Sequence, residues 1–278
     1  MPEKKIMWPH TARPDYDKAE YVKAEIEKMR EFAFKEIDEA MSINNRVYKN
    51  ICLFSLIDCF AQEYANYPTS GLSKAFCDFI LKFQDYYDYL ELPEPVTLFY
   101  DYEPKLRELA SGPEMPEPEL SEPGTEVSID DLGPLDGQKV SEVIRTNKAE
   151  EILTVIRREE GRKEAKNYRR NHRLIHLIYK MRSKAVHELS RMGNENKWEI
   201  EDGRDEPFYR DMVRLYEFEG NIVSEDFYEL VIPNRFIYNL TQNTLSNFFD
   251  FCLKEQRLPL ENRSNFKRAY IAACFPGI

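Results

Sequence analysis

Apolar residues recur every three or four positions along much of this chain, and that spacing limits what it can fold into. Residues 16–41 place their apolar side chains on one helical face, after a Pro and an Asp in RPDYD that are typical helix-start signals. The next run, residues 45–67, is apolar through its middle, which predicts a helix buried on most sides that ends before Pro68. A third helix is predicted over residues 70–90, and it should form a tight helical hairpin with the second.

The composition changes between Glu91 and Gly137, where the sequence becomes rich in Pro and acidic residues. Residues 112–125 in particular have almost no apolar side chains to bury. This composition predicts a long acidic insertion, residues 91–137, that is a loop and partly disordered.

The rest of the chain is predicted to be helical except for one hairpin. Helical spacing covers residues 139–161 and 171–193, where Gly193 is a plausible stop. Alternating apolar and polar residues on either side of Gly220-Asn221 predict a β-hairpin over residues 207–233. The apolar positions of one more amphipathic helix then follow, namely Leu245, Phe248, Phe249, Cys252 and Leu253. A tail, residues 258–278, carries a second short helical pattern.

These elements predict a mainly α fold in one domain, residues 15–278, after an N-terminal tail of residues 1–14. The expected architecture is an antiparallel helical bundle with the acidic insertion and a small β-hairpin before the last core helix. With 278 residues and 42% hydrophobic residues, the chain is long enough to bury a sizeable core.

Composition excludes several classes of function. No apolar run approaches the roughly 18 residues of a membrane helix, so we expect a cytoplasmic protein with no membrane partner. The five cysteines form no CxxC pair and lie mostly in apolar runs, which indicates reduced core residues. No cofactor is expected, because the chain has no P-loop, GxGxxG, HExxH or GxSxG motif and no cluster of metal ligands. The formal net charge of -11 argues against a general nucleic-acid coat protein.

One segment has the opposite charge to the chain as a whole. Residues 157–173 carry three Glu and eight basic residues: Arg157, Arg158, Arg162, Lys163, Lys166, Arg169, Arg170 and Arg173. Such a run fits either a solvated, salt-bridged helix face or a surface that binds RNA phosphates. Lys184, a little further on, is the remaining candidate for RNA binding.

The basic run leads into the helical segment YKMRSKAVHEL, residues 179–189. At about 100° per residue, Arg182 lies only about 40° from Ile178, so it points toward the core side of the helix. A guanidinium there must meet a carboxylate, a cleft or another subunit, and Asp58, within LFSLIDCFAQ, is the best candidate for a structural partner. His187 lies about 140° around the helix from Arg182.

The spacing of Arg182 and His187, four residues between them near the end of a helix, resembles the HEPN superfamily of ribonuclease and nucleotide-binding domains. The family signature is an Arg followed after four to six residues by a His. The resemblance extends to the helical layout over about residues 15–255, but its specific part is six residues long. It implies a metal-independent endoribonuclease, such as a toxin or phage-defence effector, that acts as a homodimer through the motif helix and has an antitoxin or defence partner.

In that reading Arg182 and His187 are the catalytic residues. His187 would activate the 2'-hydroxyl of the RNA, and Arg182 would offset the charge that develops on the phosphoryl oxygens. The expected supporting residues are Asp58, Ser183 and Tyr179. The other histidines are expected to have other roles, His176 in packing and His172 and His10 at the surface.

A second function stays open. The residue after the motif Arg is commonly Asn, Asp or His in the HEPN nucleases, whereas here it is Ser183. The alternative is therefore a non-catalytic HEPN-type interaction or dimerisation module, in which Arg182 and His187 stabilise helix ends or a dimer.

Overall fold

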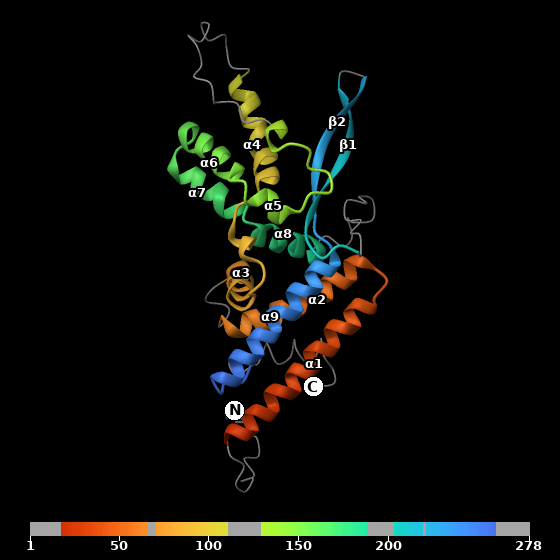
Figure 1. Cartoon of the computed structure of the whole chain (residues 1–278), viewed down its shortest axis with the longest axis vertical. Helices are drawn as coiled ribbons and strands as arrows, with labels where there is room; N and C mark the ends of the chain where they lie inside the picture. The colour runs from red at the N-terminus through yellow and green to blue at the C-terminus, as the bar shows by residue number, and fades with distance from the viewer. Residues whose placement is uncertain (1–17, 66–70, 111–128, 188–202, 219–220, 260–278) are drawn as a thin grey trace, which may run out of the picture.

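The amphipathic patterns form helices that pack into two connected groups, with one β-hairpin projecting beside them, in a computed structural model (Figure 1). The structure describes residues 18–65, 71–110, 129–187, 203–218 and 221–259. In chain order the elements are α1 (Lys18–Ser42), α2 (Arg46–Tyr64), α3 (Leu72–Phe83), the 3-10 turn η1 (Asp88–Glu91), α4 (Pro95–Ala110), η2 (Ile129–Leu132), α5 (Val140–Ile144), α6 (Lys148–Glu159), α7 (Arg162–Asn171), α8 (Leu174–His187), β1 (Phe208–Phe218), β2 (Asn221–Val231) and α9 (Asn234–Lys254). The predicted mainly α class, with a hairpin before the last core helix, is confirmed.

The larger group is built around α2, which contacts α1, α3, α8 and α9. The side chains of α2 are buried on most sides, as its apolar sequence predicts, and Asn45 caps its first turn by accepting hydrogen bonds from two backbone N–H groups. Aromatic rings hold the helices together: Phe248 of α9 lies 5.0 Å from Phe79 and 5.7 Å from Phe60, measured between ring centroids. Burying each such side chain stabilises the fold by about 1.5–3 kcal/mol.

The smaller group contains α4, α6 and α7, which share a second apolar core. Its centre is formed by Leu98 and Tyr102 of α4 and by Leu153 and Ile156 of α6, all almost fully buried. This group holds α7 at one side of the molecule (Figure 1).

Helix α4 corrects the prediction of a loop across residues 91–137. Acidic and Pro-rich composition concealed an amphipathic helix, because Pro95 is favourable in a first turn and the apolar side chains that follow face one side. Glu94 starts the helix, since its carboxylate accepts hydrogen bonds from the backbone N–H groups of Val96 (2.8 Å) and Thr97 (2.7 Å). The most acidic stretch, residues 112–125, lies outside the described residues.

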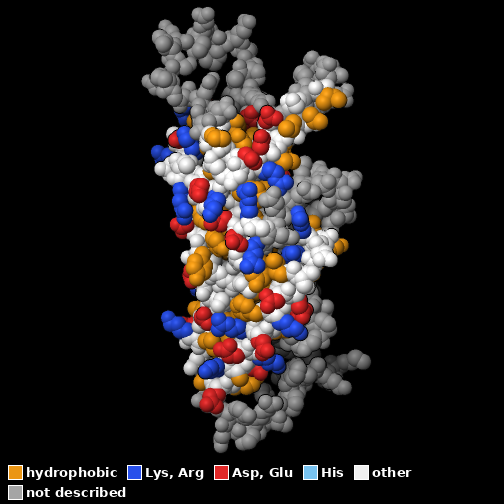
Figure 2. Space-filling view, turned by 45° about the vertical axis from the view of Figure 1, so that its right-hand side comes forward, with side chains coloured by type: hydrophobic (Ala, Val, Ile, Leu, Met, Phe, Trp, Pro, Cys, Tyr) orange, Lys and Arg blue, Asp and Glu red, His pale blue; other side chains and the backbone are white. Residues whose placement is uncertain are grey.

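The β-hairpin is antiparallel and pairs Phe208 with Val231 at its base and Phe218 with Asn221 at its far end. Its base is fixed by Tyr209, whose hydroxyl donates to the Glu94 carboxylate at 2.6 Å. The far half projects away from the helices, where Figure 2 shows hydrophobic side chains. Val213, Leu215 and Ile222 are 58%, 68% and 80% exposed there.

Two further predictions can be compared with this fold. Cys77 and Cys252 are buried, as expected of core cysteines, whereas Cys52 and Cys59 are only half-buried. Among the described residues no helix is long and apolar enough to cross a membrane. The predicted stop at Gly193 and the helical pattern in the tail lie outside the described residues.

Candidate functional site

Arg182 is committed to a buried ion pair inside a single chain. It lies on α8, and its Nε donates to Oδ2 of Asp58 on α2 at 2.6 Å, while one of its terminal nitrogens pairs with the same oxygen. Arg182 is 9% exposed and Asp58 is 5% exposed. Tyr179, one turn earlier on α8, places its ring 5.8 Å from the guanidinium carbon. The contact expected from the sequence is therefore present.

Burial makes the charge of Asp58 depend on its pairing with Arg182. Burial raises the pKa of the Asp58 carboxyl, and the positive charge of Arg182 together with its hydrogen bond opposes that rise. The second carboxylate oxygen, Oδ1, has no hydrogen-bond partner among the described residues. The Asp58 charge thus depends on Arg182, and moving the guanidinium onto an RNA phosphate would leave a buried carboxylate unpaired.

The other motif residues do not gather around Arg182. Ser183 is half-buried and Lys184 is exposed. His187 is the last described residue of α8, and its side chain lies outside the description. Since five residues on a helix correspond to about 140°, Arg182 and His187 stand on different faces of α8. The structure brings Arg182 together with Asp58 and Tyr179. Both were predicted as supporting residues, and Asp58 was also the predicted structural partner of Arg182.

The basic run forms a cationic face on α7. At about 100° per residue, all five basic residues of this helix fall within an arc of about 120°. They are Arg162, Lys163, Lys166, Arg169 and Arg170. Glu164, the acidic residue of α7, lies outside that arc and its carboxylate accepts weakly from Asn167.

Most cations of the run have no ion-pair partner in the described part of the chain. Arg169 pairs with Glu150, and Arg158, in the last turn of α6, pairs with Glu159 at 2.8 Å. The remaining cations of the basic run on α6 and α7 are exposed and show no such pair: Arg157, Arg162, Lys163, Lys166 and Arg170. The interpretation as a salt-bridged helix face therefore holds for two residues of this surface and fails for most of it.

Helix α7 is held in place by its opposite side. Ala165 is buried in the second core, and the Tyr168 ring stacks on the His172 ring with centroids 5.7 Å apart. His172 Nε2 lies 2.7 Å from Oδ2 of Asp101 on α4, and Nδ1 lies 2.8 Å from the Tyr168 carbonyl oxygen. The prediction that His172 is a surface residue was wrong, because the ring is 3% exposed. A short helix with one buried side and one cationic side results.

Two side chains near this surface were missed as binding candidates. Lys180 is exposed on α8, and His176 is half-buried. His176 follows Arg173 at three positions and Lys180 at seven, a helical spacing that places all three on one side and that could have identified them.

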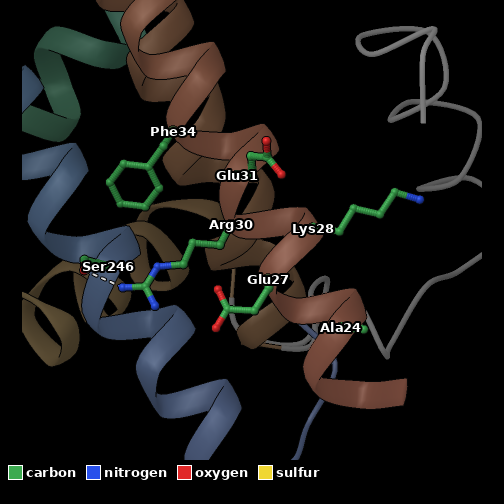
Figure 3. A pocket seen from close by; sticks show the side chains of 7 residues that line it. All are labelled: Ala24, Glu27, Lys28, Arg30, Glu31, Phe34 and Ser246. Atoms are coloured by element: carbon green, nitrogen blue, oxygen red, sulfur yellow. Dashed lines mark hydrogen bonds between the residues drawn. The ribbon is translucent and has the colours of Figure 1, made fainter. Parts of the chain in front are cut away.

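A hollow and possible metal ligands were also considered as sites. An open hollow of about 690 Å³ lies where α1 approaches α9, and Figure 3 shows the side chains that line it. Arg30, which points toward α9, already donates to Asp250 (2.9 Å) and Ser246 (3.1 Å), so the cation that faces the hollow is used in the contact between the two helices. Within the described ranges no group of three or more His, Cys, Asp or Glu could hold a metal ion.

No family model, curated protein or solved structure matches this chain. The candidate site therefore rests on the chain's own geometry, which consists of a buried Arg182–Asp58 pair and, apart from it, the cationic face of α7.

Proposed function

We propose that this protein is a non-catalytic interaction module that binds RNA through the cationic face of α7. The observation that supports it is the position of Arg182, which the buried Asp58 carboxylate already occupies within the same chain. A guanidinium in that state is paired within the fold, and moving it onto a substrate phosphate would leave the buried Asp58 carboxylate without its partner.

RNA suits the cationic face for chemical reasons. Arginine presents a planar fork of N–H donors that matches phosphate oxygens, and two exposed arginines of α7, Arg162 and Arg170, have no ion pair in the described part of the chain. Residues four apart on a helix rise by about 6 Å, so Arg162, Lys166 and Arg170 make a regular row of charges along the helix. The net charge of -11 restricts binding to this local surface.

The experiment measures binding and cleavage together. Purified protein is incubated with single-stranded RNA in excess EDTA, alongside the triple variant Arg162→Gln, Lys163→Gln, Lys166→Gln. The matched control removes three exposed lysines from α1, with Lys23→Gln, Lys28→Gln and Lys35→Gln. We expect the α7 variant to bind RNA at least about tenfold more weakly. The slope of the logarithm of the binding constant against the logarithm of the salt concentration should fall by about two, because each of the three lost phosphate contacts releases about 0.7 counterions.

The same samples test the nuclease. We expect intact RNA from the wild-type protein. Metal-independent cleavage that leaves a 2',3'-cyclic phosphate, spares DNA and disappears in both Arg182→Ala and His187→Ala would instead establish the HEPN endoribonuclease. Equal RNA affinity in the α7 variant and the α1 control would contradict the proposed binding surface.

The interaction module also bears on assembly. The face of α8 that carries Arg182 is covered by α2 of the same chain, so a homodimer through α8 would have to use its other side, where Lys180 and Lys184 are exposed. Light scattering of the wild-type protein and of Lys180→Glu with Lys184→Glu tests this. A dimer that the double variant dissociates would support the α8 contact, and a wild-type monomer at micromolar concentration would contradict it.

A further inference from the structure

A half-buried histidine lies among cations where α7 meets α8. His176 is on the first turns of α8, and three positive side chains act on it electrostatically: Arg170 at the end of α7, Arg173 between the helices and Lys180 one turn further along α8. Burial and these three charges lower the pKa of the His176 ring, so the free protein keeps it neutral near pH 7.

Two carboxylates act on this corner, Asp78 on α3 and Asp101 on α4, and Asp101 interacts with Lys180 as well as with His172. Asp78 on α3 is the acid that acts on His176 in the opposite direction, and Asp78 is itself paired with Lys74. Lys180 and Arg170 are exposed and show no ion pair within the described ranges. The Nε atom of Arg173 is buried and has no hydrogen-bond partner among the described residues. Two exposed cations without an ion pair beside a third, partly buried arginine leave an excess of positive charge here, which an anion from solution can offset.

The His176 ring contacts the thiol of Cys77, which can change its hydrogen-bond partner when the ring takes up a second proton. Sγ of Cys77 on α3 lies 3.4 Å from Nδ1 of His176 and 4.0 Å from the carbonyl oxygen of Ile175. Burial raises the pKa of Cys77 to about 12, so the thiol stays protonated, and it can donate to Nδ1 in the neutral tautomer that carries its proton on Nε2. When Nδ1 takes a proton from solvent, the S–H can turn to the Ile175 carbonyl, and no other bond changes.

We propose that Arg170, Arg173 and Lys180 bind a phosphate group at this corner, and that His176 takes up one proton from solvent as the phosphate binds. The proposal rests on the RNA surface proposed above, since it makes the end of α7 the place where one backbone phosphate is held most firmly. Burial and the three cations keep His176 neutral, and the anion offsets the contribution of the cations, so proton uptake and binding favour each other. Phosphate binding at this corner is therefore stronger at acidic pH.

The probe is sulfate, which keeps its charge over the relevant pH range, titrated at constant ionic strength with chloride. The His176 ring signal in NMR, identified by its loss in His176→Gln, reports protonation of this residue. We expect sulfate to raise the pKa of His176 and to bind roughly fivefold more tightly at about pH 5.5 than at about pH 7.5. In His176→Gln that pH dependence should disappear.

The control variants locate the effect. Lys180→Gln should weaken sulfate binding several-fold, whereas Lys28→Gln, an exposed lysine on α1, should leave it unchanged. A His176 signal that titrates identically with and without sulfate would overturn the proposal, and so would an equal pH dependence in His176→Gln.

The outcome is separable from that of the proposed function. RNA binding that depends on Arg162, Lys163 and Lys166 without any response of His176 overturns the phosphate corner and leaves the RNA surface standing. A His176 response to sulfate in a protein that does not bind RNA supports the corner and overturns the proposed function.

Discussion

The α2–α8 contact and the α7 surface use the same guanidinium group in opposite surroundings. Arg182 is 9% exposed and meets one carboxylate, whereas Arg162 and Arg170 are exposed and have no ion pair in the described part of the chain. A buried charge must be paired within the fold, so its removal affects folding. An exposed charge contributes little to stability and is available to a partner. The difference shows that Arg182, the residue of the sequence motif, is paired inside the fold, and it supports the proposal that the basic run is the surface that meets a partner.

The largest effect on stability is expected when the buried Arg182–Asp58 pair is broken. Asp58→Ala should destabilise the protein by about 3–5 kcal/mol, because it leaves the Arg182 guanidinium buried without its partner. Urea unfolding measures the change, and Glu39→Ala, which removes an exposed ion pair with Lys35, should cost only about 0–1 kcal/mol.

A compensated variant sharpens the same comparison. Asp58→Leu combined with Arg182→Met replaces both charges by apolar side chains, and its stability should return to about the wild-type value or exceed it. RNA binding should be retained. A double variant as unstable as Asp58→Ala would show that the loss comes from packing and would contradict an ion-pair role.

A smaller effect is expected at a buried charge that has more partners. Glu94 is fully buried, and its carboxylate accepts from two backbone N–H groups and from the Tyr209 hydroxyl. Tyr209→Phe removes one of these three donors and should cost about 1.5–3 kcal/mol, the range for hydrogen bonds to charged groups. Tyr86→Phe is the matched control, because Tyr86 is 77% exposed. Equal stabilities of the two variants would show that the other two donors suffice for Glu94.

The pair of His172 and the partly exposed Asp101 should have a still smaller, pH-dependent effect on stability. The hydrogen bond from His172 lowers the pKa of Asp101, and the attraction of its charge adds to this. A carboxyl whose pKa is lower in the folded state stabilises the fold above the unfolded value of about 3.9, and loses that contribution as the pH falls through the folded value. Unfolding experiments from neutral to acidic pH should therefore show a shallower loss of stability for Asp101→Asn than for the wild type. Parallel curves would exclude this linkage.

The smallest effect is expected on α7. The triple variant Arg162→Gln, Lys163→Gln, Lys166→Gln should change stability by no more than about 0.5 kcal/mol per residue while it weakens RNA binding. Melting temperatures measured beside the α1 control test this. A large loss of stability would mean that these cations serve the fold, and the contrast with Arg182 would disappear.

Much of the fold could be predicted from local patterns. The helices near both ends of the described chain and the hairpin follow from periods of three to four and of two, which a segment carries in its own residues. Helix α4 could not be predicted in this way, because its Pro and acidic residues are typical of loops and its apolar side chains acquire a partner only when α6 packs against them. The prediction that His172 lies at the surface was wrong for the same reason, since its partner Asp101 comes from a different helix.

The sequence by itself determined most of the helices and the hairpin, and it determined that Arg182 must meet a carboxylate, a cleft or another subunit, because periodicity and the cost of burying a charge are local properties. Only the tertiary structure decided which charges are used up and which face outward. Asp58 and Arg182 are 124 positions apart, and their pairing depends on α8 lying against α2. The corner around His176 likewise exists only because α3, α7 and α8 meet there, since electrostatic interactions depend on distance in space and not on separation along the chain.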